Sequence, residues 1–227
     1  MPEIITIRLS LPYKLGSVNC YLIKTDTGYI LIDAGGPNKC KELEKNLENA
    51  GCEPGNLKLI VLTHGDFDHT GNAAYLGKKF GVKIAMHYDD SGMVERGNMF
   101  WNRKKSNMIF RIIAPILFGF GKSERFKPDL YLEDGENLSE YGFDAKVIHI
   151  PGHSRGSIGI LTTDGDLICG DLLENIDKPK FNSLMDDLET ANVSVEKLQG
   201  LKANTVYPGH GKPFQMELFF KNWRGSL

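Results

Sequence analysis

Four side chains of the types that bind metal ions lie within six consecutive positions of this 227-residue chain. They occur in Leu59–Asn72, which reads LIVLTHGDFDHTGN, and they are His64, Asp66, Asp68 and His69. The segment begins with a short apolar run that suits a buried strand. Imidazole and carboxylate groups are ligands that zinc, iron and manganese accept. Because groups at alternate positions of a turn beyond a strand can converge, the segment predicts a metal site rather than an ordinary polar loop.

Three more candidate ligands occur further along the chain, and each follows the end of an apolar segment. They are His153 in the sequence IPGH, Asp171 in ICGD and His210 in YPGH. Loops at strand ends bring functional groups together at one rim of a sheet. A single histidine of this kind is often a surface residue. Three ligands with the same local pattern as the first cluster indicate one shared site.

Other polar residues are candidates to support these ligands. Asp33 ends an apolar run, and it either bonds a metal-binding histidine or only the backbone of its own turn. Thr70 directly follows the first cluster, and His149 lies within a predicted strand four residues before His153. A packed or supporting role is favoured for His149. His87 follows another strand and is interpreted as a capping or surface residue.

Apolar periodicity and turn residues predict a chain of short strands and a few helices. Expected strands cover residues 4–9, 19–25, 29–33, 57–63, 83–86, 129–132, 144–150, 157–162, 166–169 and 204–207. Expected helices cover residues 37–50, 70–80, 184–198 and 217–223. All the candidate ligands therefore follow strand ends.

The composition is that of an ordinary globular protein, with 41% hydrophobic and 25% charged residues, and we expect one domain over residues 1–227. The net charge of −2 implies no general attraction to nucleic acid. Four scattered cysteines indicate a reduced chain, so we expect a cytoplasmic location. The N-terminus has no basic region followed by an apolar one, so we expect no signal peptide. No apolar stretch is long enough to cross a bilayer.

The segment 92–128 differs from the rest of the chain. It contains eight lysine and arginine residues but only two glutamates, and it includes the interrupted apolar run 108–120. It is a candidate for a lid over the site, a contact in a homo-oligomer, a helix at a membrane surface, or a helical insertion packed on the domain. Its charge suits a small-molecule substrate that is anionic or amphipathic.

Taken together, the motifs resemble those of the metallo-β-lactamase-fold hydrolases over nearly the whole chain. The matching motifs are LIDAG at 31–35, THGDFDH at 63–69, PGH at 151–153, CGD at 169–171 and PGH at 208–210. The resemblance implies an α+β fold, an αββα sandwich of two mixed sheets face to face with helices outside, and a two-metal site at one edge. It also implies the ligand sets: His64, Asp66 and His153 for one metal, Asp68, His69 and His210 for the other, and Asp171 between them.

One residue departs from the family pattern, which is usually His-x-His-x-Asp-His, because Asp66 replaces the second histidine. A carboxylate binds zinc, but it favours harder ions such as iron or manganese. The flavodiiron branch has a glutamate at this place, but its flavin-binding domain is absent from this sequence. Asp66 either binds the metal or swings away and leaves the first site weak or empty; binding is favoured because an unpaired carboxylate beside a cation is unusual. We expect two divalent ions, with zinc preferred and iron or manganese as alternatives.

The resemblance implies a hydrolase in which hydroxide between two metals attacks an ester, thioester, lactone or phosphoester bond. Asp68 is the candidate catalytic residue, because it can orient the water or pass a proton to the leaving group. The alternatives are an iron-dependent oxidoreductase that uses persulfide or oxygen, and a non-enzymatic protein with a structural site. The glyoxalase II branch is disfavoured, since it usually has a C-terminal helical domain and only 17 residues follow His210.

Overall fold

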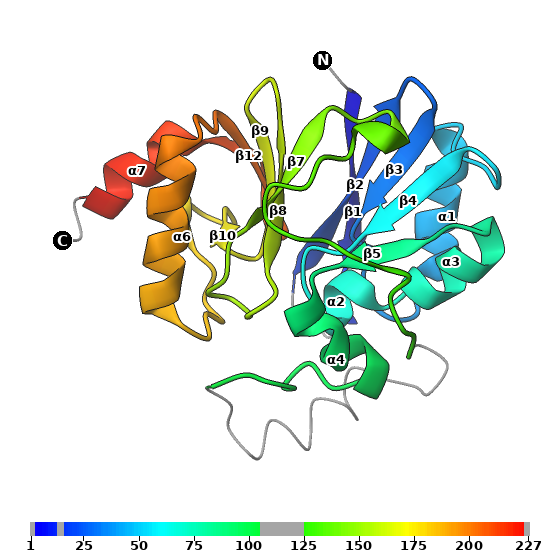
Figure 1. The fold of residues 1–227 in the computed structure, drawn as a ribbon, viewed down its shortest axis with the longest axis horizontal. Coiled ribbons are helices and arrows are strands. Elements are labelled where there is room, and N and C mark those ends of the chain that lie inside the picture. The colour runs from blue at the N-terminus through cyan, green and yellow to red at the C-terminus, as the bar shows by residue number, and fades with distance from the viewer. Residues whose placement is uncertain (1–2, 13–15, 105–124, 225–227) are drawn as a thin grey trace.

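The strands of this chain form two main sheets that face each other, with helices on both outer sides (Figure 1). The computed structural model describes residues 3–12, 16–104 and 125–224. The expected αββα sandwich is confirmed by this arrangement. The apolar run 108–120, considered as part of a lid, an oligomer contact, a membrane-surface helix or a packed helical insertion, lies outside the described residues.

The first sheet has six strands in the order β1-β2-β3-β4-β5-β6. These are β1 (Glu3–Ser10), β2 (Ser17–Thr25), β3 (Gly28–Ile32), β4 (Leu57–Val61), β5 (Ile84–Met86) and β6 (Leu130–Tyr131). The strands β1 to β3 pair antiparallel, whereas β3 to β6 pair parallel. Parallel pairing of β3 with β4 requires a crossover, which α1 (Cys40–Asn49) supplies. The two strands therefore end side by side, and Asp33 and Thr63 follow their ends.

The second sheet has five strands in the order β13-β12-β9-β8-β7. They are β7 (Ala145–His149), β8 (Ile158–Thr162), β9 (Asp166–Gly170), β12 (Thr205–Pro208) and β13 (Phe214–Gln215), and β10 (Leu173–Glu174) pairs separately with β11 (Lys180–Phe181). Between β9 and β12 the chain forms α6 (Leu188–Gly200), and these two strands pair parallel. Parallel pairing places the residues that follow them, Asp171 and His210, at the same edge.

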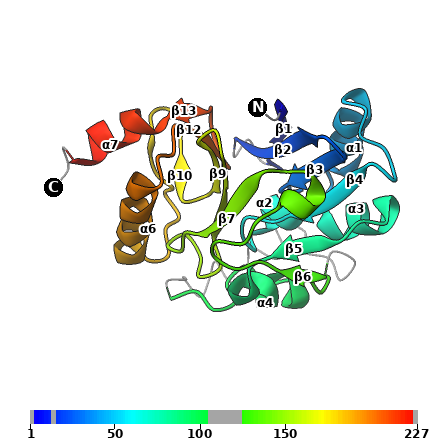
Figure 2. The same cartoon turned by 45° about the horizontal axis from the view of Figure 1, so that its top comes forward.

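Apolar side chains fill three layers between these elements. The layer between the sheets includes Tyr21, Ile30, Val61, Ile160 and Ile168, all nearly inaccessible to solvent. On the outer sides, α1 and α3 (Ala73–Phe80) cover the first sheet, while α6 and α7 (Met216–Arg224) cover the second (Figure 2). Burial of each sheet on both faces explains why the sequence reads as short, almost continuous apolar runs.

Two helices differ from the sequence prediction. The predicted helix 70–80 is divided into α2 (Phe67–Thr70), which contains two candidate ligands, and α3. A further helix, α4 (Tyr88–Arg96), was not predicted, because its apolar stripe is weak. Within the described residues, no helix combines the length and apolarity needed to span a bilayer.

His87 and His149 form a stacked pair between α4 and β7. Their ring centroids lie 4.2 Å apart with an angle of 3° between the ring planes. His87 caps α4, because its Nδ1 accepts a hydrogen bond from the backbone N–H of Asp89 at 3.2 Å. The Nε2 of His149 contacts the carbonyl oxygen of Arg155 at 2.8 Å. His149 therefore packs against His87, and of its two predicted roles, packing and support of a metal ligand, these contacts are of the first kind.

The stacked pair predicts an acid-sensitive contribution to stability. Burial and the neighbouring His149 lower the pKa of His87. The unfolded chain therefore binds this proton more readily than the folded chain does, and the free energy of unfolding decreases as pH falls below the unfolded-state pKa. We expect His87→Asn, which keeps an acceptor at the helix N-cap, to make this decrease shallower between about pH 7.5 and pH 5. Urea denaturation of the metal-free variant and wild type across this range tests it, and identical slopes would contradict it.

Candidate metal centre

The seven predicted ligands lie together at the edge where β4, β9 and β12 end. They form overlapping groups, and within each group the candidate ligand atoms lie within 4.8 Å of one another: His64, Asp66 and His153; His64, His69 and Asp171; Asp68, His69 and His210. Asp171 lies between the other ligands, with an oxygen 3.3 Å from the Nε2 of His69 and another 3.3 Å from the Nε2 of His210. We call the first of these the Asp66 group and the last, together with Asp171, the Asp68 group.

Asp33 holds two of the histidines through one carboxylate. It accepts hydrogen bonds from the backbone N–H of Thr63 at 2.8 Å and from the Thr63 hydroxyl at 2.8 Å, and it contacts the Nδ1 of His69 at 2.8 Å. Because an ionised carboxylate only accepts, His69 carries its proton on Nδ1. The Thr63 oxygen, having donated to Asp33, accepts from the Nδ1 of His64 at 2.9 Å. In both rings Nε2 is thus the nitrogen that faces the site and that would bind a metal ion.

A backbone carbonyl fixes the third histidine in the same way. The Nδ1 of His210 lies 2.8 Å from the carbonyl oxygen of Ser17, so it donates there and leaves Nε2 free for a ligand. The preceding Gly209 is required by close packing, since a Cβ atom there would lie 2.1 Å from Oδ1 of Asp171. The Tyr21 hydroxyl donates to the carbonyl of Pro208 at 2.6 Å and anchors this loop to the first sheet.

The residues present fit a divalent metal ion. Among the described residues, His64 Nε2, His69 Nε2 and Asp171 Oδ1 are buried and have no hydrogen-bond partner. Unpartnered buried polar atoms are costly, and here they face one another. Burial alone would lower the pKa of His210, but Asp171 and Asp68 raise that pKa to about 11. The carboxylates therefore create a surplus of negative charge that protons satisfy in the chain alone and that a cation would satisfy by displacing them.

Asp66 is paired with an arginine that the sequence analysis did not identify as part of the site. The Nη2 atom of Arg103 lies 2.7 Å from Oδ1 of Asp66, and both side chains are buried. Burial opposes ionisation of Asp66, but the charge of Arg103 and the contact with His153 hold the pKa of Asp66 well below its usual range. Asp66 has not swung away, because its Oδ2 lies 3.0 Å from the Nε2 of His153.

Two more residues support the loops that carry the ligands. The buried Asp90 of α4 accepts hydrogen bonds from the N–H of Gly65 at 3.0 Å, from the hydroxyl of Ser154 at 2.6 Å and from the N–H of Gly156 at 2.8 Å. It therefore joins the loop of the first cluster to the loop of His153. Thr70, a predicted supporting residue, donates to the backbone carbonyl of Asp66 from both its hydroxyl and its backbone N–H, each at 3.0 Å.

The site is more open on one side than on the other. The side chains of Asp68 and His210 are 12% and 14% exposed, whereas those of the Asp66 group are at most 4% exposed. The Oδ2 atom of Asp68 and the Nε2 atom of His210 lie 3.3 Å apart. Access from solvent therefore leads to the Asp68 group.

Arg103, Asp90 and Thr63 were missed because little in their local sequence distinguishes them. Arg103 belongs to the basic segment 92–128, whose charge was noticed, but the sequence does not say which of eight cations reaches the site. Asp90 lies in a helix that was not predicted. Only the Thr-His order at Thr63 offered a signal, since a hydroxyl before a ligand can relay a hydrogen bond.

Comparison with known proteins finds one matching family and several similar hydrolases. A family model described as the metallo-beta-lactamase superfamily matches residues 13–210. The chain is 29% identical over 209 residues to hydroxyacylglutathione hydrolase GloC of Haemophilus influenzae, covering 88% of this chain and 89% of that protein. It is 28% identical over 187 residues to acyl-coenzyme A thioesterase MBLAC2 of Bos taurus, covering 77% of this chain and 62% of that protein.

Comparison with solved structures finds proteins with a similar fold. The crystal structure of TTHA1623 in a di-iron-bound form matches with a TM-score of 0.70 and 26% identity, covering 94% of this chain and 96% of that one. A metallo-beta-lactamase family protein of Thermus thermophilus, TTHA1429, matches with a TM-score of 0.71 and 24% identity, covering 98% and 79% of the two chains. The second likeness concerns the fold alone.

The hydrogen bonds of Asp33 lead to a prediction about metal affinity. Asn in place of Asp33 offers an N–H to the Nδ1 of His69, which favours the tautomer with its proton on Nε2, where a metal would bind. Asparagine tolerates the backbone φ of +62° found here, so the change does not strain the turn. We expect Asp33→Asn to weaken metal binding by about 10- to 100-fold. Competition with a chromogenic chelator measures this, with the exposed Asp26→Asn as control; unchanged affinity in Asp33→Asn would contradict the tautomer argument.

Proposed function

Because the chain belongs to the metallo-β-lactamase superfamily, we propose that it hydrolyses acyl thioesters with the help of divalent metal ions. The observation that carries the proposal is the convergence of seven histidine and aspartate side chains with buried, unpartnered nitrogen and oxygen atoms. The substrate class is supported by two relatives whose names describe action on acylglutathione and acyl-coenzyme A. Both substrates are thioesters, so hydrolysis of one type of bond accounts for both names.

The chain length does not argue against this substrate class. Few residues follow His210, which by itself disfavours the glyoxalase II branch. However, the hydroxyacylglutathione hydrolase of Haemophilus influenzae matches along 89% of its own length. A relative of this activity therefore matches without a large additional domain, and the expectation against the glyoxalase II branch is wrong.

The residues of the site suit this reaction. A metal ion held by them supplies a Lewis acid and a water molecule whose pKa is near neutral. Water adds to the thioester carbonyl carbon, the carbon–sulfur bond breaks, and the products are a carboxylic acid and a thiol. Asp68 is exposed enough to meet the substrate and can pass a proton from the water to the departing sulfur. A thiol ionises at about pH 8.5, so this leaving group needs less help from an acid than an alcohol does.

The ligand types narrow the choice of metal ion. Histidine and aspartate ligands suit zinc, while Asp66, in place of a histidine, adds a harder oxygen that suits iron or manganese. One structural neighbour was solved in a di-iron-bound form. We therefore propose zinc or iron at two positions, the Asp68 group and the Asp66 group, with Asp171 shared between them.

An anionic part of the substrate would meet basic residues beside the site. A cavity of about 270 Å³ adjoins the His153 loop and is lined by Lys104, Arg155 and Gly152 among others. Acidic residues also line it, and Lys104 pairs with Asp187. This cavity is the proposed position for the charged end of a glutathione or coenzyme A thioester.

Removal of the shared carboxylate tests the metal-dependent reaction. We expect Asp171→Ala to lose bound metal and to reduce kcat/KM for thioesters by a factor on the order of 100 or more. The matched control is Asp177→Ala, since Asp177 is an exposed residue of a nearby loop. Metal content by mass spectrometry and thioester hydrolysis would be measured on the same samples. Full activity with full metal content in Asp171→Ala would rule out the proposed role.

A substrate panel tests the reaction class itself. We expect S-acylglutathione and acyl-coenzyme A thioesters to be hydrolysed faster than a lactone, a phosphodiester or a β-lactam. Stoichiometric iron together with turnover that requires oxygen or persulfide would instead favour the oxidoreductase alternative.

A further inference from the structure

Arg103 brings a permanent positive charge into the Asp66 group. Its side chain is 6% exposed, and its Nη2 lies 2.7 Å from Oδ1 of Asp66 and 3.2 Å from the Nε2 of His153. A guanidinium group keeps its charge at any pH at which proteins are folded. Two of the three candidate ligands in this group therefore already contact a cation that belongs to the chain.

The contact with His153 engages the atom that a metal ion would need. Unlike the other three ligand histidines, His153 has no hydrogen-bond partner for its Nδ1 among the described residues, so its ring is held only through Nε2. Its Nε2 faces both Arg103 and Oδ2 of Asp66. When Nε2 accepts from the guanidinium, its lone pair is engaged by Arg103.

The Asp68 group has a different electrostatic environment. In the described parts of the chain, the ion pairs of Asp68 and Asp171 are with histidines only. This group combines two carboxylates with two histidines whose Nδ1 atoms are held by Asp33 and Ser17, and it is the more exposed side of the site. Like charges repel strongly where burial reduces screening, so the two groups should differ in their affinity for a divalent cation.

We propose that Arg103 acts as an internal cation that competes with a metal ion for the Asp66 group. The Asp68 group then fills first, and the Asp66 group fills only at a higher metal concentration. This inference rests on the proposed metal dependence and adds an order of occupancy to it. It also gives Asp66 a reason to be an aspartate, since a histidine at that position would remove the carboxylate that the guanidinium contacts.

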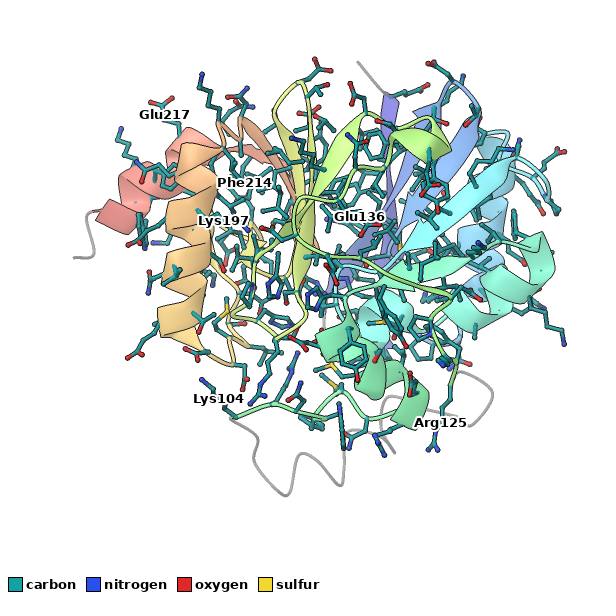
Figure 3. The ribbon with its side chains drawn as sticks, viewed as in Figure 1. Lys104, Arg125, Glu136, Lys197, Phe214 and Glu217 are labelled. Atoms are coloured by element: carbon teal, nitrogen blue, oxygen red, sulfur yellow. The ribbon has the colours of Figure 1, made fainter. Side chains whose placement is uncertain are left out.

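The backbone around Arg103 holds it in this place. The N–H of Arg103 donates to the carbonyl of Phe100 at 3.3 Å, and the N–H of Lys104 donates to Asp186 at 3.1 Å. The side chain of Asn102 donates to the carbonyl of Asp89 in α4 at 3.0 Å. Figure 3 shows Lys104, the next residue, at the lower edge of the described structure, below the lower end of α6. The guanidinium is thus directed into the site by an anchored turn.

Metal titration of the full chain, first stripped with a chelator, tests the proposal without measuring activity. Zn²⁺ would be added in competition with a chromogenic chelator, and Co²⁺ would report the coordination of each equivalent by its visible spectrum. For the wild type we expect one tight and one weak equivalent. Arg103→Met keeps most of the side-chain length but removes the charge. For this variant we expect the second metal equivalent to bind at least about tenfold more tightly than in the wild type.

Two further variants separate charge from shape and from folding. Arg103→Lys keeps a cation and should keep the wild-type difference between the two equivalents. Lys104→Met removes a neighbouring charge whose partner is Asp187, outside the ligand set, and should bind both metal equivalents as the wild type does. Circular dichroism would confirm that each variant is folded.

Several results would overturn the inference. Two equally tight equivalents in the wild type would do so without any variant. An unchanged or weaker second equivalent in Arg103→Met would show that Arg103 assists the metal or is indifferent to it, and the proposed hydrolase would still stand. Absence of metal binding in the wild type would overturn the proposed function and this inference together.

Discussion

The carboxylate of Asp33 is the constraint on which the rest of the site depends. It binds no metal in the proposed arrangement, yet it fixes the protonation of His69 directly and of His64 through the Thr63 hydroxyl. A histidine can coordinate only through a nitrogen without a proton, so the orientation of both rings follows from one acceptor. The backbone of Asp33 has a positive φ, which turns the chain sharply at the end of β3 and brings this carboxylate under the neighbouring loop.

Parallel pairing between strands gives this network its rigidity. β3 ends beside β4, and β9 ends beside β12, so each pair delivers two functional loops to one edge. The two sheets are held face to face by their apolar layer, which brings the two pairs of loops together. Bonds such as that from Tyr21 to the carbonyl of Pro208 connect the sheets at the site itself. The ligands thus depend on the packing of the whole sandwich.

The buried carboxylates of the site require compensating positive charge. Asp33, Asp66, Asp68 and Asp171 are all buried or nearly so, and so many carboxylates are tolerated only with compensating cations. Histidine protons, metal ions and the guanidinium of Arg103 are the available partners. Because Arg103 is covalently part of the chain, the Asp66 group carries its own counterion, whereas the Asp68 group depends on what it binds.

Much of this organisation could be predicted from the sequence. The order of strands, the ligand types and their positions after strand ends were all readable, because ligand spacing and apolar periodicity are local properties. The division of the helix after His64, the helix α4 and the stacking of His87 on His149 were not, because they depend on packing between elements. The alternatives for Asp33 also stayed open, since turn chemistry alone cannot distinguish a bond to its own backbone from a bond to a residue 36 positions away.

By itself, the sequence determined which side chains are available for metal chemistry and that they belong at strand ends. The tertiary structure alone decided which groups surround each of them. Arg103 shows the difference, because it lies 37 positions from Asp66 in a segment where eight basic residues looked equivalent. A charge acts over a few ångströms within a buried site, and sequence separation does not reveal that distance.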